Sequence, residues 1–196
     1  MAHYFINDNN LKSSIKMIKT TIRNKQYTFY TDSGVFSRKE IDFGTRILIE
    51  SLPLDRFNGK TLDMGCGYGP IGIFIADNTT AEVHMVDINL KALDLVRQNV
   101  ELNKIKNVKI YESNIYQNVT EKFDFIISNP PIRAGKEVVY KIIFEAKNYL
   151  NNDGELWLVI RKKQGAKSLL KDLEQDYITK IIKRNNGFFV VSAKIR

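Results

Sequence analysis

Short apolar runs alternate with amphipathic segments from Lys60 onward, and this alternation constrains the fold more than any other feature. It is the pattern expected when crossover helices pack on a largely parallel sheet. Asn89 follows the apolar run at 82–87 and is in N-cap position for the helix expected at 90–102. The pattern predicts strands at 61–64, 82–87, 108–111, 123–128 and 155–160, and helices at 71–76, 90–102 and 137–150.

The C-terminal part predicts a change of strand direction. A helix is expected at 165–176, and apolar runs at 177–182 and 188–195 flank the triplet Asn185-Asn186-Gly187. An Asn-Gly pair between two such runs is a strong signal for a tight hairpin turn. The sequence therefore predicts a doubly wound, Rossmann-like α/β sheet that is mostly parallel and ends in an antiparallel hairpin.

The N-terminal part is less regular than the rest. A chain of 196 residues matches one globular domain. We expect residues 1–44 to be an N-terminal extension that packs on a core domain of residues 45–196. The elements expected here are strands at 15–22 and 26–30, a turn at Ser33-Gly34, and a helix at 45–52 that Pro53 stops.

A glycine-rich turn follows the first core strand. Glycines permit positive φ angles and let a ligand approach the backbone closely. The segment 67–72 also fits the dinucleotide fingerprint, which leaves a nicotinamide or flavin enzyme open. Asp63 would repel a pyrophosphate, whereas S-adenosylmethionine has an ammonium, a sulfonium and no phosphate. The electrostatics favour the methyl donor, bound by Asp63, Gly65, Cys66, Gly67 and Gly69.

Two later strand ends extend this predicted cofactor site. Asp87 follows Gly69 by 18 residues, near the spacing of about 20 expected of an acid that holds ribose hydroxyls. The alternative role for Asp87 is helix capping. Asn114 is placed where its amide would meet adenine, although Asn is also a common turn residue. Ile88 and Ile115 complete the predicted contacts with the cofactor.

The fourth strand stops at Asn129-Pro130-Pro131-Ile132. Two prolines fix φ and remove two backbone donors, so the tetrad is a rigid array of acceptors. The exocyclic amine of a base is a poor nucleophile because its lone pair is delocalised into the ring. An Asn oxygen and a neighbouring carbonyl that accept both N–H bonds would direct that lone pair toward a methyl group. The tetrad predicts a catalytic site for N-methylation without a metal.

These motifs resemble class I S-adenosylmethionine-dependent methyltransferases, in particular the small-domain guanine-N2 methyltransferases of small-subunit (16S-type) ribosomal RNA. Segments 34–46 and 161–167 are similar to the segment before this family's cofactor loop and to its late basic loop. The resemblance runs from about Thr31 to the C-terminus and implies a seven-stranded methyltransferase sheet. Larger bacterial members have two tandem halves, whereas this chain has room for one.

The resemblance also implies roles for residues outside the motifs. Phe36 would lie beside the target base, and Asp42, Gly44 and Thr45 would border the methionine end of the cofactor. The residues alone support another interpretation equally well. In it, Phe36 is a hydrophobic staple and Gly44-Thr45 is the start of a helix. The predicted contacts with the substrate are Phe36, Arg38, Arg133, Arg161, Lys162 and Lys163.

Charge favours nucleic acid as the partner. The formal net charge is +8, and residues 160–196 hold ten Lys or Arg against three acidic residues. A basic surface attracts polyanions but does not specify a base. Arg161, Lys162 and Lys163 follow the fifth strand and would lie on the same rim as Asn129. We therefore expect RNA as the substrate, and the family resemblance implies that this RNA is ribosomal RNA or the small ribosomal subunit.

Several classes of protein are disfavoured by composition. Cys66 is the single cysteine and only His3 and His84 are histidines, so we expect no disulfide, no metal site and a reducing cytoplasm. No apolar run approaches the roughly 18 residues of a membrane span, and the first residues do not have the pattern of a signal peptide, so we expect a protein that is neither membrane-spanning nor exported.

The acceptor remains the open question. Methyltransferases for adenine N6 or glutamine commonly carry an aromatic residue where this chain has Ile132, and Ile cannot stack a flat base by its face. Guanine N2 in RNA is the leading hypothesis. The alternatives are adenine N6, a protein glutamine or a small-molecule amine as acceptor, a nucleotide-dependent oxidoreductase, and a non-catalytic RNA-binding module.

Overall fold

The computed structural model describes residues 14–32 and 40–196. The expected turn at Ser33-Gly34 and the expected substrate contacts Phe36 and Arg38 lie outside these ranges. Every other residue that the sequence assigns to a site can be placed.

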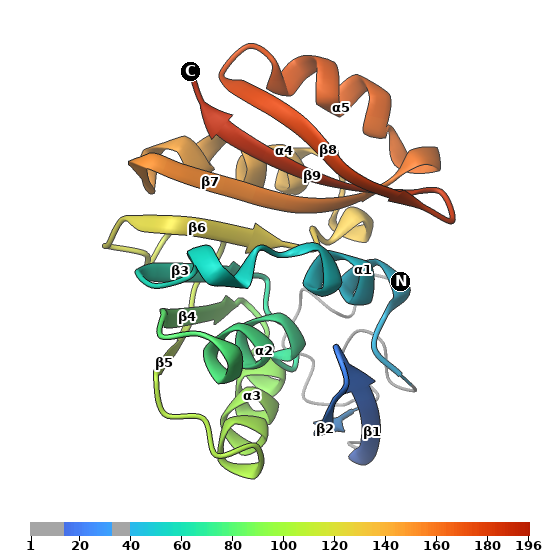
Figure 1. The fold of residues 1–196 in the computed structure, drawn as a ribbon, viewed down its shortest axis with the longest axis vertical. Coiled ribbons are helices and arrows are strands. Elements are labelled where there is room, and N and C mark those ends of the chain that lie inside the picture. Colours follow the sequence, from blue (N-terminus) through green and yellow to red (C-terminus); the bar gives the residue numbers. More distant parts are fainter. Residues whose placement is uncertain (1–13, 33–39) are drawn as a thin grey trace.

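A seven-stranded sheet forms the centre of the molecule, with strand order β5-β4-β3-β6-β7-β9-β8 (Figure 1). The first five of these strands are parallel, and β9 pairs antiparallel with both β7 and β8. The predicted mostly parallel sheet with a terminal antiparallel hairpin is confirmed. The strands are β3 (Lys60–Met64), β4 (Glu82–Asp87), β5 (Val108–Glu112), β6 (Phe123–Ser128), β7 (Leu150–Arg161), β8 (Tyr177–Asn185) and β9 (Phe188–Ile195).

Helices cover both faces of this sheet, because each has one apolar stripe to bury. On α5, for example, Ala166, Leu169 and Leu173 are buried on one side. Residues of α1, α2 and α3 share one core cluster, and residues of α4 and α5 share the other. The helices are α1 (Phe43–Ser51), α2 (Pro70–Asn78), α3 (Leu90–Leu102), α4 (Lys136–Phe144) and α5 (Ala166–Leu173), with 3₁₀ turns η1 (Leu54–Arg56), η2 (Ile132–Ala134), η3 (Glu145–Asn148) and η4 (Lys162–Gln164).

Several predicted boundaries were wrong. The helix expected at 137–150 ends at Phe144 and continues only as the turn η3, and β7 begins at Leu150 rather than at 155. The polar stretch Asn151-Asn152-Asp153-Gly154 looks like a loop, yet it extends β7 beyond a register shift opposite β6. The helix expected at 165–176 is α5, which Gly165 starts in a left-handed conformation (φ 84°) and which ends at Leu173. The helix expected at 45–52 starts earlier, at Phe43.

The strands expected near the N-terminus form a separate hairpin of β1 (Lys16–Ile22) and β2 (Lys25–Thr31). Its buried side chains belong to the same core cluster as α1, α2 and α3. The Asn99 side chain on α3 joins this hairpin to the glycine-rich turn: its oxygen accepts the Tyr30 N–H, and its nitrogen donates to the carbonyls of Tyr30 and Tyr68. The division of the chain at residue 44 stays a prediction.

The ends of the parallel strands β3, β4, β5 and β6 define two opposite edges. Their carboxyl ends lie on the side of the sheet where α1 begins and where the turn between β8 and β9 lies, at the right in Figure 1. In the described residues, no helix is long and apolar enough to cross a bilayer. Every placed residue of the predicted cofactor, catalytic and substrate sites lies near the carboxyl edge.

Candidate active site at the carboxyl edge of the sheet

The glycine-rich turn joins β3 to α2 through three residues with positive φ, namely Gly65 (73°), Gly67 (57°) and Gly69 (92°). The N–H groups of Gly65 and Cys66 donate to the Val86 carbonyl at 2.9 and 3.0 Å, which fixes the turn against β4. A Cβ built on Gly65 would meet no atom within 4 Å. The backbone there faces open space, as the approach of a ligand requires.

Asp63 lies at the end of β3 and is fully buried. Its Oδ2 accepts the Gly72 N–H at 2.8 Å, while its Oδ1 has no hydrogen-bond partner among the described residues. Burial raises the pKa of Asp63 to about 7, and the negative charge of Asp87 adds to the effect. A buried carboxylate with one unsatisfied oxygen is costly unless a donor or cation meets it.

Asp87 connects the glycine-rich turn to the start of α3. Its Oδ2 accepts the Gly67 N–H at 2.9 Å, and its Oδ1 accepts the Asn89 N–H at 2.9 Å. The expected N-cap is confirmed, because Asn89 Oδ1 accepts the N–H groups of Lys91 and Ala92. Asp87 is therefore not the capping residue of α3, and its neighbour Ile88 is half-buried at the same edge.

The third part of the predicted cofactor site follows β5. Asn114 is exposed, Ile115 is half-buried, and both line a cavity of about 450 Å³ together with Tyr149. Ile115 has φ 54°, a left-handed conformation that a β-branched residue rarely adopts and that costs energy. Asp87 of β4 pairs with Glu112 of β5 in the sheet. Asn114 follows Glu112 by two residues, which places it at the same carboxyl edge of the sheet as Asp87.

Asn129 follows β6 and is tied to the start of α1. Its Nδ2 lies 3.2 Å from Asp42 Oδ2 and 2.9 Å from Thr45 Oγ1. Asp42 is the N-cap of α1 and accepts the Thr45 N–H at 3.1 Å. A carboxylate only accepts hydrogen bonds, so the amide NH₂ must face Asp42 and the amide oxygen must point the other way. The side chain is held as an acceptor.

The remaining residues of the tetrad form a rigid turn. The carbonyls of Pro131 and Ile132 accept the N–H groups of Ala134 and Gly135 and so close η2. No described residue donates to the carbonyl of Pro130. The Asn129 amide oxygen and the Pro130 carbonyl are thus two acceptors, adjacent in sequence, to which no described residue donates. The catalytic role of these acceptors stays a prediction.

Gly44 brings the start of α1 close to the C-terminal hairpin. A Cβ there would lie 3.0 Å from Asp42 Oδ2 and 3.0 Å from the ring of Phe188. The Phe188 ring also contacts Phe43, and Arg161 lies over it at 5.5 Å. The predicted residues at the methionine end of the cofactor are therefore contiguous with the basic segment.

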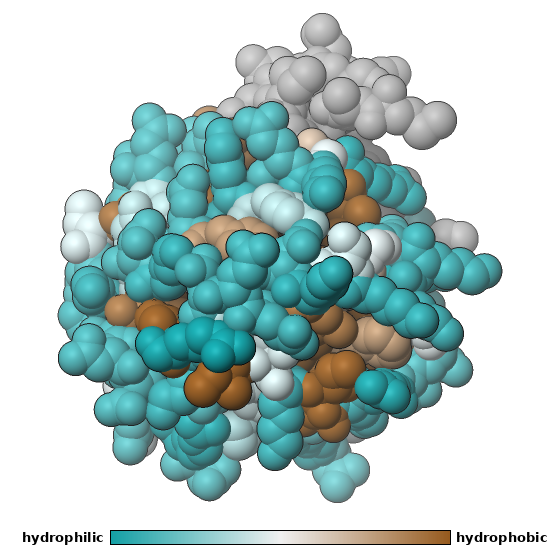
Figure 2. All heavy atoms as spheres, turned by 90° about the horizontal axis from the view of Figure 1, so that it is seen from above, coloured by the Kyte–Doolittle hydropathy of each residue, from teal (hydrophilic) through white to brown (hydrophobic). Residues whose placement is uncertain are grey.

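The basic residues expected to contact substrate lie on this rim and are exposed: Arg133 on η2, Arg161 at the end of β7, and Lys162 and Lys163 on η4. The Lys162 N–H donates to the Gly187 carbonyl at 2.7 Å, which holds the segment against the turn between β8 and β9. Figure 2 looks onto the α5, β8 and β9 end of the molecule and shows a mostly hydrophilic surface with separate hydrophobic patches.

Sequence reasoning missed Tyr68, the residue between two glycines of the turn. Its side chain is 2% exposed and its hydroxyl has no hydrogen-bond partner among the described residues. Burial and the charge of Asp42 raise the pKa of this phenol. The Tyr68 hydroxyl and Asp63 Oδ1 are thus two buried polar atoms at this turn and the strand before it that have no hydrogen-bond partner among the described residues. The position of Tyr68 inside the glycine motif was the available signal.

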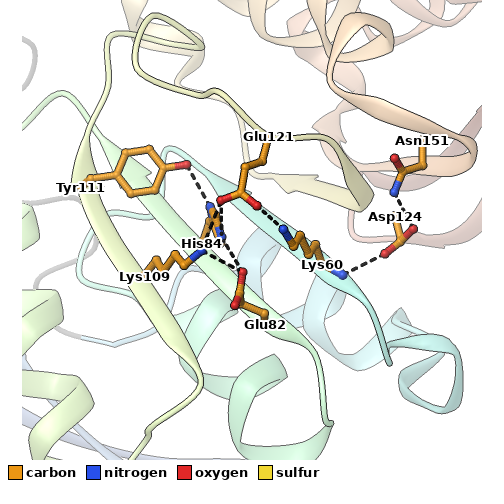
Figure 3. Close-up of polar contacts among 8 residues, drawn as sticks. All are labelled: Lys60, Glu82, His84, Lys109, Tyr111, Glu121, Asp124 and Asn151. Atoms are coloured by element: carbon orange, nitrogen blue, oxygen red, sulfur yellow. Dashed lines mark hydrogen bonds and ion pairs between the residues drawn. The ribbon is translucent and has the colours of Figure 1, made fainter.

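A second polar cluster lies at the opposite, amino edge of the sheet (Figure 3). Glu82, His84 and Glu121 offer ligand atoms within 4.8 Å of one another, a grouping that the sequence did not predict. Lys109 pairs with both carboxylates, and Lys60 also pairs with Glu121. These lysines neutralise the acids, so we interpret the cluster as an ion-pair network that closes the amino edge.

Comparison with known proteins agrees with this geometry. A family model described as methyltransferase small domain matches residues 26–192. The Bacillus subtilis protein YbxB is 44% identical over 197 residues, and the alignment covers 98% of both chains. The ribosomal RNA small subunit methyltransferase C of Haemophilus influenzae is 36% identical over 172 residues, which are 85% of this chain and 51% of that protein.

Solved structures agree on the fold. The T. thermophilus 16S rRNA N2 methyltransferase RsmC, in complex with AdoMet and guanosine, matches with a TM-score of 0.84 and 26% identity, over 95% of this chain and 52% of that one. A ribosomal protein L11 methylase from Lactobacillus delbrueckii matches with a TM-score of 0.66 and 20% identity, which shows a shared fold alone. This chain spans about half the length of the ribosomal RNA methyltransferases it matches. The chain belongs to the methyltransferase small domain family.

Proposed function

We propose that this protein transfers a methyl group from S-adenosylmethionine to the exocyclic N2 amine of a guanine in small-subunit ribosomal RNA. The observation that carries the proposal is the orientation of Asn129. Asp42 and Thr45 hold its NH₂ group, which leaves its oxygen as an acceptor next in sequence to the Pro130 carbonyl, to which no described residue donates.

The carboxyl edge fits S-adenosylmethionine better than a dinucleotide. Asp63 presents an unsatisfied buried oxygen, which suits a cation and would repel a pyrophosphate. Gly65 leaves open space over the backbone, and Asp87 lies at the distance along the chain expected for an acid that binds ribose. The bound cofactor would supply an electrophilic methyl carbon on a sulfonium. That the T. thermophilus RsmC structure contains AdoMet supports this assignment.

In the proposed reaction, the protein orients the exocyclic amine of the guanine. An NH₂ group that donates one N–H to Asn129 Oδ1 and the other to the Pro130 carbonyl would have its lone pair directed out of the plane of the base. The two acceptors also favour the positive charge that develops on nitrogen. As the N–C bond forms, the S–CH₃ bond would break and release a neutral thioether, and the methylated nitrogen, now cationic and acidic, would lose one proton to water, so no strong base is required.

RNA as the substrate is supported by the basic rim and by relatives. Arg133, Arg161, Lys162 and Lys163 are exposed at the edge that carries Asn129, where they would contact phosphates. Two matched proteins are named as ribosomal RNA methyltransferases, one of which holds guanosine. A ribosomal RNA substrate would place the enzyme in the cytoplasm.

Transfer of tritiated methyl groups tests the proposal. The purified protein is given labelled S-adenosylmethionine and small ribosomal subunits from cells that lack the gene, and the RNA is digested to nucleosides. We expect N2-methylguanosine as the labelled product. Label in N6-methyladenosine, or in protein alone, would contradict the proposal.

The matched control compares two Asn-to-Ala variants. Asn129→Ala removes the proposed acceptor, whereas exposed Asn58 precedes β3 at the opposite edge. We expect Asn129→Ala to lose activity by roughly 10²- to 10³-fold while keeping its affinity for the cofactor. Asn58→Ala should retain full activity. Equal activity of the two variants would remove the basis for the proposed mechanism.

A further inference from the structure

A small cavity lies between the starts of α4 and α5. Its volume is about 240 Å³, and Ile132, the last residue of the tetrad, forms part of its wall. Val139, Ile160 and Leu169 make the rest of its lining largely apolar, and Tyr140 adds an aromatic ring. The cavity is therefore adjacent to the tetrad but distinct from the glycine-rich turn and from Asn129.

We propose that this cavity binds the nucleobase of a nucleotide next to the methylated guanine, a role that rests on the proposed RNA substrate. Drug-sized ligands occupy pockets of roughly 300–1,000 Å³, so a smaller apolar cavity suits one flat base. Aromatic side chains bind single-stranded nucleic acid by stacking, irrespective of sequence. The inferred occupant is thus a stacked base rather than the target itself.

The Tyr140 ring is held in place for such a contact. Its hydroxyl donates to Asp172 Oδ2 on α5 at 2.6 Å, so the ring bridges the two helices that form the cavity. Lys136 Nζ lies 4.7 Å from the centre of the same ring. Because Lys136 itself lines the cavity, a cation is present where a phosphate would pass.

Charge around the cavity is complementary to a nucleotide. No acidic side chain is among its lining residues, and the nearby Asp172 carboxylate accepts the hydrogen bond of the Tyr140 hydroxyl. Gly135 and Gly165 start α4 and α5 without a side-chain cap, so the first N–H groups of both helices are available to an anion. The exposed Lys163 and Lys167 flank Gly165 along the chain. The cavity thus combines an apolar slot with a positive mouth, as expected for a base and its phosphate.

Ser168 offers a way to close the cavity without disturbing the catalytic site. It lines the cavity from the first turn of α5, where it is exposed, so a larger residue there should fold normally. Ser168→Trp fills the slot, and Ser168→Ala leaves it open. A second pair changes the ring: Tyr140→Leu removes it, and Tyr140→Phe keeps it.

The probes are two labelled pentaribonucleotides, 5′-UUGUU-3′ and the same strand with abasic sites on both sides of the guanine. Affinities are measured by fluorescence anisotropy at one fixed salt concentration, since phosphate contacts depend on salt. We expect the wild-type protein to bind the intact strand about tenfold more tightly than the abasic strand. Ser168→Trp and Tyr140→Leu should lose this preference, while Ser168→Ala and Tyr140→Phe should keep it.

The outcomes separate this inference from the proposed function. If the wild-type protein binds both strands equally, or if Ser168→Trp keeps the preference, the cavity does not hold a base, whatever the methylation assay shows. If neither strand binds but a hydrophobic peptide of a ribosomal protein does, the inference that RNA occupies the cavity is also wrong. Loss of the preference in Ser168→Trp and Tyr140→Leu, with unchanged melting temperature and affinity for S-adenosylmethionine, supports the inference.

Discussion

Asn129 Nδ2 donates to Thr45 Oγ1 at 2.9 Å, which joins the end of β6 to the first turn of α1 across 84 residues of sequence. Asp42 accepts from the same nitrogen and from the Thr45 N–H. The orientation of the proposed catalytic amide therefore depends on the cap of a helix that contains no part of the tetrad.

The first prediction concerns the hydrogen bond between Asn129 and Thr45. Thr45→Val keeps the shape of the side chain but removes the hydroxyl acceptor, so Asn129 should occupy its active orientation less often. We expect methyl transfer to fall by about tenfold, less than for Asn129→Ala, because Asp42 still accepts one hydrogen bond. The measurement is kcat and KM for both substrates. A normal kcat would show that Thr45 does not position Asn129.

Much of the site could be predicted because parallel strands end at one edge of a sheet. Asp63, Asp87 and Asn129 are far apart in sequence, yet each follows or ends such a strand, so alternation alone predicts that they lie on one rim. The turn between β8 and β9 was equally predictable. Asn186 and Gly187 both have positive φ (44° and 76°), as an Asn-Gly turn requires.

Contacts between distant segments could not be predicted. Nothing in local spacing indicates that Thr45 meets Asn129, or that Lys60 pairs with Glu121. The predicted start of β7 was wrong for another reason. Residues 151–154 are polar, whereas the buried Leu150 before them already pairs with Phe123 of β6. Tertiary context outweighed local propensity there.

The second prediction concerns pH. Because burial raises the pKa of Asp63 to about 7, this carboxyl group is largely protonated at pH 6 and ionised at pH 8. A cationic cofactor prefers the ionised form, so affinity for S-adenosylmethionine should rise about tenfold between pH 6 and pH 8. Calorimetry in buffers of different ionisation enthalpy should show that binding releases a proton. In Asp63→Asn this pH dependence should disappear, and its persistence would exclude Asp63 as the titrating group.

The third prediction concerns the packing of the glycine-rich turn. A Cβ on Gly72 would lie 2.4 Å from the sulfur of Met85, a fully buried residue of β4. Gly72→Ala should therefore lower the free energy of unfolding by about 1–3 kcal/mol. Met85→Ala makes room, so the double variant should be more stable than the sum of the two single changes predicts. Urea denaturation of all four proteins measures this coupling, and strict additivity would contradict the steric explanation.

The last prediction concerns the ion-pair network at the amino edge. Hydrogen bonds from Lys60 and Lys109 lower the pKa of Glu121 to about 2 from 4.5. A carboxyl group with a lowered pKa in the folded state stabilises the fold fully above its unfolded pKa and loses this effect as pH falls toward 2. Glu121→Gln should thus lower the melting temperature at pH 7, with the difference from wild type shrinking below about pH 4.5. Glu101→Gln, at an exposed position of α3, is the matched control and should show no such pH dependence. A difference from wild type that stays constant from pH 7 to pH 3 would show that the negative charge of Glu121 is not what stabilises the edge.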